Sequence, residues 1–135
     1  MQHFLGLTYS SVCICVLASA SAVAGDLTKE ALGSYELKGS YNQRVKISSP
    51  NGGRSFIGTF EVFTRGCQGD VRMAGQASGR YSILFVKKDP NVEGGACKIN
   101  VVFSPNFNNI EVSHTYCGYS GASCDFNGKL QRTKR

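Results

Sequence analysis

The strongest constraint on the fold of this chain is an alternation of apolar and polar residues with a period of two. Residues 44–47 read Arg-Val-Lys-Ile, and the same alternation recurs through residues 97–103 and 110–113. Successive side chains of a strand point to opposite faces of the sheet, so this pattern indicates strands with one buried and one solvated face. Antiparallel sheets permit such faces, whereas parallel sheets are usually covered on both sides.

Residues that favour turns separate these segments at intervals of roughly ten residues. The chain is therefore predicted to be all-β: a single small antiparallel β-barrel or sandwich of about eight strands. A short helical turn is expected before the first strand, with Asp26 as N-cap and Gly33 as its stop. The strands are expected at residues 34–40, 43–48, 55–64, 70–77, 80–87, 96–104, 109–115 and 125–132.

Four apolar residues fall on faces that the alternation assigns to solvent. They are Ile57, Phe63, Leu84 and Val86. A strand that is apolar on both faces is either covered on both or takes part in a partner surface. We expect one of these two situations for the strands at residues 55–64 and 80–87.

The first residues have the pattern of a secretory signal peptide. Val12–Ala20 is an apolar run, and Ala22-Val23-Ala24 before Gly25 is the small-x-small pattern of a signal-peptidase site. The run is too short for a permanent membrane span, and no second run follows it. We expect a signal peptide at residues 1–24, a single β domain at residues 25–135, and a periplasmic or secreted product.

The charge of the chain is positive but dispersed. Fifteen Lys and Arg against nine Asp and Glu give a formal net charge of +6. The bases are scattered through the expected strands, and no zinc, helix-turn-helix or stacking motif accompanies them, so nucleic acid is not an expected partner. Dispersed positive charge favours solubility and weak attraction to anionic surfaces.

Four cysteines follow the signal peptide: Cys67, Cys97, Cys117 and Cys124. An even number in a small exported chain predicts two disulfides that staple the fold. No metal site is expected, because no C-x2-C pair exists. A Cys97–Cys117 bridge across a hairpin is compatible with the strand pattern; the other pairings are 67–97 with 117–124, and 67–117 with 97–124. We favour 67–97 with 117–124, since Gly118 and Gly121 make that local loop easy to close.

No set of catalytic residues is apparent. His114 is the only histidine after residue 24. On a strand, the side chains of Ser113 and Glu111 would point to one face of the sheet and that of His114 to the other, so they could not act together. The acidic residues lie beside no aromatic-rich stretch that would bind sugar for a glycosidase. Gly52-Gly53 and Gly94-Gly95 open no helix, so we interpret them as turns and not phosphate loops. We expect no catalytic activity and no cofactor.

Two loops combine Ser, Gly and Tyr, the residue types that make adaptable protein contacts. The first is residues 78–81, and the second is residues 116–123, which include the whole segment between the last two cysteines. The simpler alternative is that glycine turns the chain and Tyr81 begins the next strand. We expect the second loop to be a neighbour of the first, and partner contacts at Ser78, Gly79, Arg80, Tyr81, Tyr119 and Ser120.

These residues resemble the periplasmic lysozyme inhibitors of Gram-negative bacteria. Members of that group are small antiparallel β-barrels or sandwiches that insert a loop into the substrate cleft of a lysozyme. The Ser-Gly-x-Tyr motif belongs to inhibitors of invertebrate-type and goose-type lysozymes, and here it covers residues 78–81 with Arg80 at x. The Cys-x6-Cys-Asp-Phe-x-Gly segment, Cys117 to Gly128, is similar to the exported inhibitors of chicken-type lysozyme.

The resemblance implies an exported, non-enzymatic inhibitor whose partner is a lysozyme of chicken, goose or invertebrate type. It implies that Tyr81 fills a saccharide subsite, while Ser78 and the backbone of Gly79 hydrogen-bond the catalytic carboxylates. The alternative that follows from the charge is a basic secreted binding protein for an anionic polymer, such as lipopolysaccharide or an acidic glycan, or for a host surface.

The positive charge has a consequence for the lysozyme hypothesis. Two basic proteins repel each other at long range, which lowers the rate of association with a strongly basic lysozyme. Either the target is a less basic lysozyme, or local acidic residues offset the repulsion. In the second case such a patch would lie around Asp89, Glu93 or Glu111.

Overall fold

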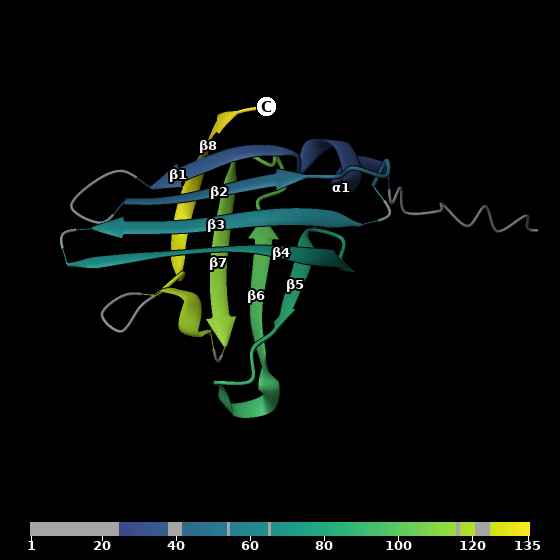
Figure 1. Cartoon of the computed structure of the whole chain (residues 1–135). Coiled ribbons are helices and arrows are strands. Elements are labelled where there is room, and N and C mark those ends of the chain that lie inside the picture. Colours follow the sequence, from purple (N-terminus) through teal and green to yellow (C-terminus); the bar gives the residue numbers. More distant parts are fainter. Residues whose placement is uncertain (1–24, 38–41, 54, 65, 116, 121–124) are drawn as a thin grey trace, which may run out of the picture.

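Eight antiparallel strands pair in chain order, and the last pairs with the first, so that the sheet closes into a barrel (Figure 1). The computed structural model describes residues 25–37, 42–53, 55–64, 66–115, 117–120 and 125–135. The predicted all-β fold is confirmed, and the barrel is the architecture that forms. The strands are β1 (Gly33–Leu37), β2 (Asn42–Ser48), β3 (Phe56–Thr64), β4 (Cys67–Gly79), β5 (Ser82–Lys88), β6 (Ala96–Phe103), β7 (Asn109–Thr115) and β8 (Gly128–Lys134).

Short helical segments occupy both ends of the barrel. The predicted helical turn is α1 (Gly25–Glu30), and Gly33 begins β1 with a φ of +136°. Single 3-10 turns, η1 (Glu93–Gly95) and η2 (Gly118–Ser120), lie in the connections after β5 and after β7. The expected signal peptide and the side chain of Asp26, the expected N-cap, lie outside the described part of the chain.

The strand β4 is longer than the predicted strand at residues 70–77 and extends beyond it at both ends. Residues 66–69 fall between two predicted strands, but Cys67 already pairs with Thr64 across the β3–β4 hairpin. Gly66, with a φ of +87°, lies in the tight turn. Inward-facing Cys67 and Gly69 then continue the alternation of β4. Of the two glycines in this segment, Gly66 therefore lies in the turn and Gly69 lies inside the strand.

Aromatic rings fill the centre of the barrel. The rings of Phe60 and Phe85 meet edge to face with centroids 5.1 Å apart, and Phe126 meets Phe60 at 6.4 Å. All three side chains are fully buried. A Cβ atom on Gly75 would lie 2.5 Å from Cδ1 of Phe85, and one on Gly58 would lie 2.6 Å from Cε2 of Phe60. Two glycines on the inner face thus make room for the rings.

The helix α1 covers one end of this core, and Arg132 of β8 holds it there. The guanidinium donates to the carbonyl oxygens of Leu32 and Phe107 at 2.7 and 2.9 Å, to the carbonyl of Glu30, and to the Tyr35 hydroxyl at 2.6 Å. It also lies over the Tyr35 ring, 4.8 Å from the centroid. One side chain therefore joins the helix, the first strand, the last strand and the β6–β7 connection.

Three of the four apolar residues predicted on solvated faces are exposed in the described part of the chain. The exposed fractions are 59% for Phe63, 36% for Leu84 and 43% for Val86, while Ile57 is half-buried. The described elements therefore do not cover the outer face of β5, and its role as a partner surface stays a prediction. Val102 of β6, also 43% exposed, was not singled out from the sequence.

The packing of Gly75 generates a stability prediction. We expect Gly75→Ala to lower the free energy of unfolding by roughly 1–3 kcal/mol, because the new methyl group overlaps the Phe85 ring. The exposed neighbour Gln76 serves as the control, and Gln76→Ala should change stability by less than about 0.5 kcal/mol. In a urea double-mutant cycle, Phe85→Leu should relieve part of the Gly75→Ala cost; strictly additive effects would contradict the proposed overlap.

Tyr35 generates a prediction about alkaline pH. Burial raises the pKa of Tyr35 to about 12, although the nearby Arg132 guanidinium acts in the opposite direction. The folded pKa exceeds the unfolded value of about 10, so this contribution to stability is complete below pH 10 and is lost as the pH rises toward 12. We expect urea midpoints to fall less steeply over this window for Tyr35→Phe than for the wild type. Tyr81→Phe is the control, and equal slopes for all three proteins would contradict the assignment.

Candidate functional site

The turn between β4 and β5 presents three consecutive exposed residues, Ser78, Gly79 and Arg80. The β4–β5 register shifts between Ala77 and Gly79, so Ser78 is an extra residue on its strand. Its hydroxyl donates to the hydroxyl of Ser82 at 2.9 Å, which ties the two sides of the turn together. The turn is therefore exposed and internally braced.

Tyr81 anchors this turn to the barrel. Its half-buried ring packs against Phe107, with centroids 5.7 Å apart, and its carbonyl accepts a 2.7 Å hydrogen bond from the Phe103 amide. The Arg80 guanidinium lies 5.2 Å from the centre of the same ring. Tyr81 lies in the turn, one residue before β5 begins, and not at the start of the strand as the simpler alternative had it. Because its ring packs against Phe107, the groups most open to a partner are Ser78, Gly79 and Arg80.

A shallow groove of about 340 Å³ lies beside the turn. It is bounded by Ser55, residues 74–78 of β4, and Leu84 and Val86 of β5. The groove forms where β4 extends past β3, because the β3–β4 pairing ends at Gly75 while β4 continues to pair with β5. An apolar surface thus adjoins the polar tip of the hairpin.

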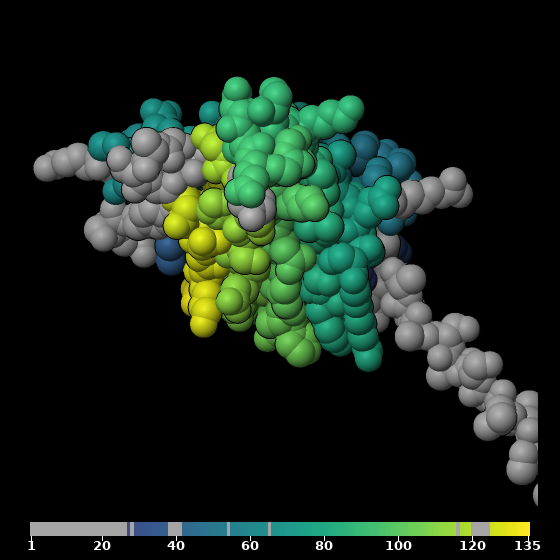
Figure 2. Space-filling model, turned by 90° about the horizontal axis from the view of Figure 1, so that it is seen from below, coloured from purple at the N-terminus to yellow at the C-terminus, as the bar shows by residue number. Residues whose placement is uncertain are grey.

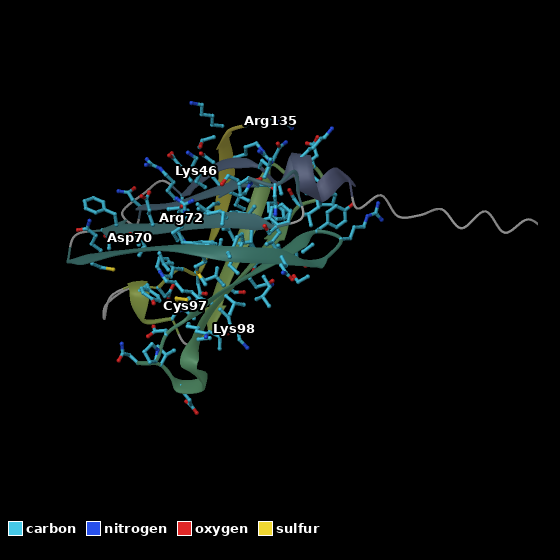
Figure 3. The ribbon with its side chains drawn as sticks, turned by 45° about the vertical axis from the view of Figure 1, so that its right-hand side comes forward. Lys46, Asp70, Arg72, Cys97, Lys98 and Arg135 are labelled. Carbon is cyan, nitrogen blue, oxygen red and sulfur yellow. A yellow bond between two sulfur atoms is a disulfide. The ribbon has the colours of Figure 1, made fainter. Side chains whose placement is uncertain are left out.

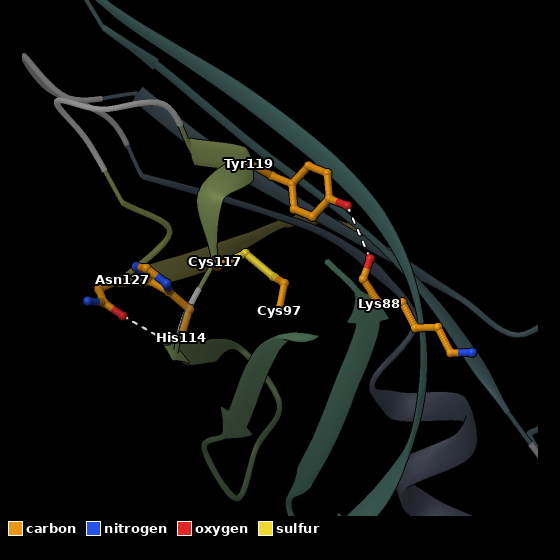
Figure 4. The surroundings of a disulfide bond; sticks show 6 residues. All are labelled: Lys88, Cys97, His114, Cys117, Tyr119 and Asn127. Carbon is orange, nitrogen blue, oxygen red and sulfur yellow. Dashed lines mark hydrogen bonds between the residues drawn. A yellow bond between two sulfur atoms is a disulfide. The ribbon is translucent and has the colours of Figure 1, made fainter. Parts of the chain in front are cut away.

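The second predicted contact loop lies at the other end of β5. The Tyr119 hydroxyl donates to the Lys88 carbonyl at 3.4 Å (Figure 4). The Lys87 ammonium lies 4.9 Å from the centre of the Tyr119 ring. Tyr119 is half-buried, and the side chain of Ser120 lies outside the described part. Ser82 and Lys88 bound β5 and are roughly 20 Å apart at 3.3 Å per residue. The prediction that the two loops are neighbours is therefore wrong.

The disulfide in this region joins Cys97 to Cys117 (Figure 4). Lys98 pairs with Thr115 in the β6–β7 register, so the chain leaving β7 passes beside Cys97. The favoured pairing of 67–97 with 117–124 is wrong, because strand register and not the ease of closing a local loop brings the sulfurs together. Cys67 is also disulfide-bonded, and Cys124 lies outside the described residues.

His114 does not assemble a catalytic set with the described residues. Its half-buried ring meets the edge of Phe126 at 6.1 Å, and its backbone amide donates to Oδ1 of Asn127 at 2.9 Å. Ser113 and Glu111 are exposed on the opposite face of β7, as the alternation predicts. The surroundings of the imidazole are therefore those of a structural residue packed beside the core.

Acidic side chains gather on the β1–β4 side of the barrel. Glu36, Arg44, Glu61 and Asp70 face one another in sequence across four strands, and we refer to them as the acidic row. Arg44 pairs with Glu36 at 2.9 Å and approaches Glu61 at 3.8 Å. Of the residues suggested for a compensating acidic patch, Asp89 is buried, whereas Glu93 and Glu111 are exposed at opposite ends of β6.

Three further observations bear on the chemistry of the site. Among the described residues, no group of three or more His, Cys, Asp or Glu side chains is placed to hold a metal ion. No helix in the described ranges is long and apolar enough to cross a membrane. Comparison of the chain with family models, curated proteins and solved structures found no match. The function of the protein is therefore inferred from the geometry of this chain.

The disulfide assignment generates a prediction that peptide mapping checks. After digestion without reduction, trypsin separates Cys67 from Cys97, and chymotrypsin, which cuts after Tyr119, separates Cys117 from Cys124. We expect one linked pair of peptides that carries Cys97 and Cys117, and a peptide joining Cys97 to Cys67 would contradict the structure. Cys97→Ala with Cys117→Ala should lower the free energy of unfolding by about 3 kcal/mol, the entropy of closing a loop with a separation of 20 residues.

Proposed function

We propose that the protein is an exported, non-enzymatic inhibitor that inserts the β4–β5 turn into the substrate cleft of a lysozyme. The observation that carries the proposal is the exposed Ser78-Gly79-Arg80 tip on a base anchored by Tyr81. A protruding turn on a rigid base is suited to enter a concave site, since little conformational entropy is lost on binding.

The chemistry of the tip suits the cleft of a glycosidase. Such enzymes usually place two carboxyl groups on either side of the bond they cleave. The guanidinium of Arg80 offers planar paired donors that match a carboxylate, and the Ser78 hydroxyl adds a further donor. Stacking over Tyr81 holds Arg80 in place before binding. On this proposal Arg80, more than Tyr81, contacts the catalytic acids.

Charge favours a particular kind of lysozyme. The acidic row includes Asp70, near the start of β4, whereas the turn follows Gly79 at the end of the same strand. The acidic row therefore lies away from the proposed contact. Glu111 is nearer, because it pairs with Val102, which in turn pairs with Ser82 beside the turn, but it is a single acid against a net charge of +6. We infer that a weakly basic or acidic lysozyme associates faster than a strongly basic one, because the net charge of +6 then repels it less.

A second candidate is a basic binding protein for an anionic polymer such as an acidic glycan. It is favoured by cations such as Lys46 and Arg72, which project from the outside of the barrel and form no ion pair with a described acid (Figure 3). Retention on an anionic column that disappears at moderate salt, without inhibition of any lysozyme, would support this function and replace the first proposal.

The proposed contact generates a prediction for inhibition. In a turbidity assay against chicken-, goose- and invertebrate-type lysozymes, we expect the mature protein to inhibit at least one type. Arg80→Ala should weaken that inhibition at least about tenfold, because a carboxylate buried in the interface loses its partner. Arg80→Lys should be intermediate, since it keeps the charge but loses the paired donors.

Arg72→Ala is the matched control, because it removes the same charge from the outer face of β4, away from the turn. It should leave inhibition within about twofold of the wild type, as expected for a charge outside the contact. Equal effects of Arg72→Ala and Arg80→Ala would place the contact elsewhere. Absence of inhibition of all three lysozyme types at micromolar excess would reject the function itself.

A further inference from the structure

The outer surface of β5 and β6 combines exposed apolar side chains with lysines. Figure 2 shows these strands, in teal and green, beside β7 and β8 on one side of the molecule. Outward-facing residues of β5 and β6, with their neighbours on β4, form what we call the β5–β6 face. Its members are Arg72, Ala74, Gln76, Leu84, Val86, Lys88, Lys98, Asn100 and Val102.

The apolar members of the β5–β6 face form one patch. Val86 lies between Ala74 on β4 and Lys98 on β6, and Leu84 lies between Gln76 and Asn100. Directly opposed side chains have Cβ atoms about 5 Å apart, and diagonal ones about 7–8 Å apart, so Val102 also reaches Leu84. Leu84 and Val86 line the groove beside the β4–β5 turn as well. The patch is therefore continuous across three strands.

Cations lie beside this patch at the end nearest η1. Lys98 directly follows buried Cys97 and points outward from β6 (Figure 3). Lys88 lies at the end of β5, Arg72 lies two residues before Ala74, and none of the three forms an ion pair with a described acid. No outward-facing position of β5 or β6 carries Asp or Glu. Exposed Glu111 of β7 lies opposite Val102, at the end of the patch away from these cations. The face thus has a centre of apolar side chains, with cations at the end near η1 and one acid at its border with β7.

We propose that the β5–β6 face docks reversibly on the surface of a bilayer that contains anionic lipid. Lysine ammonium groups would contact lipid phosphates, while Leu84, Val86 and Val102 would meet the boundary between headgroups and acyl chains. This property goes beyond lysozyme inhibition, because it uses neither Ser78, Gly79 nor Arg80. It would hold the protein at an anionic surface with the β4–β5 turn near the edge of the contact.

A second copy of the chain fits this face poorly. A stable dimer covers roughly 800 Å² on each partner, far more than the exposed parts of three aliphatic side chains. A two-fold contact would also bring Lys98 of one copy toward the lysines of the other, while Glu111, the acid opposite Val102, lies at the other end of the face from Lys98. Like charges and small apolar area therefore disfavour self-association.

The composition of the face also favours lipid over a specific acidic protein. Cores of protein interfaces are enriched in aromatic residues and arginine and depleted in lysine. The β5–β6 face carries no aromatic side chain, and two of its three cations are lysines. Lysine stems are long and flexible, so they can lie along an apolar surface while the ammonium reaches a phosphate. Such a face is suited to the mobile phosphate headgroups of an anionic lipid bilayer.

The test is flotation of the folded mature protein with phosphatidylcholine vesicles, made with and without phosphatidylglycerol. We expect binding only to the anionic vesicles, and its loss at high salt. Lys88→Gln with Lys98→Gln should weaken binding about fivefold for each lysine removed. Leu84→Ser with Val86→Thr, which leaves the charge unchanged, should also weaken binding severalfold.

The matched control is Lys46→Gln with Lys129→Gln, which removes two outward-facing lysines from β2 and β8. Binding of this control should stay within about twofold of the wild type. An equal loss in the control would show diffuse charge attraction in place of a defined face. If Leu84→Ser with Val86→Thr left vesicle binding unchanged, the face would be a site for an anionic polymer. If the face bound an acidic protein and no vesicles, it would be a protein interface. Either result overturns the proposal.

The vesicle experiment and the inhibition experiment fail independently. Arg80→Ala should reduce lysozyme inhibition yet keep most vesicle binding, because Arg80 lies in the turn and outside the β5–β6 face. Lys88→Gln with Lys98→Gln should show the reverse pattern. Circular dichroism of each variant checks that the barrel remains folded, as expected for substitutions of exposed residues.

Discussion

The guanidinium of Arg132 is the interaction on which the rest of the barrel depends. It joins β8 to the carbonyls of Glu30, at the end of α1, and of Leu32, to Tyr35 of β1, and to Phe107 in the β6–β7 connection. Without closure, β1 and β8 would expose unpaired edges that invite association with other chains. Phe107 is also the residue against which Tyr81 packs, and Tyr81 supports Arg80. A continuous set of contacts therefore runs from the closure of the sheet to the exposed turn.

The aromatic interior determines where function can reside. Phe60, Phe85 and Phe126 occupy the centre of the barrel, and the space for their rings depends on glycine at positions 58 and 75. A barrel of eight strands is just wide enough for side chains to fill it. Because these rings occupy that space, recognition by the described residues takes place on the turns and on the outer faces of the strands, as both proposals assume.

The local alternation of residues predicted the strands. The choice between a barrel and a sandwich, and the disulfide partners, depended on which strands pair over long distances in the chain. Alternation of inward and outward residues is the same in a sandwich and in a barrel, so the choice depended on β1 pairing with β8, about one hundred residues away in the chain. The disulfide shows the same limit. Gly118 and Gly121 favoured a local bridge, but the Lys98–Thr115 register placed Cys117 beside Cys97. Composition reports how easily a loop closes and not which strands are neighbours.

The separation of the two predicted contact loops follows from the order of the strands. In a meander, successive connections alternate between the two ends of the barrel, so the connection after β4 and the connection after β7 lie at opposite ends. Counting the predicted strands would have shown this once a meander was assumed. The same count places the connection after β6, which contains Phe107, at the end occupied by Tyr81, and their packing agrees with it. Strand order thus explains why Tyr81 is anchored while Ser78, Gly79 and Arg80 stay open to a partner.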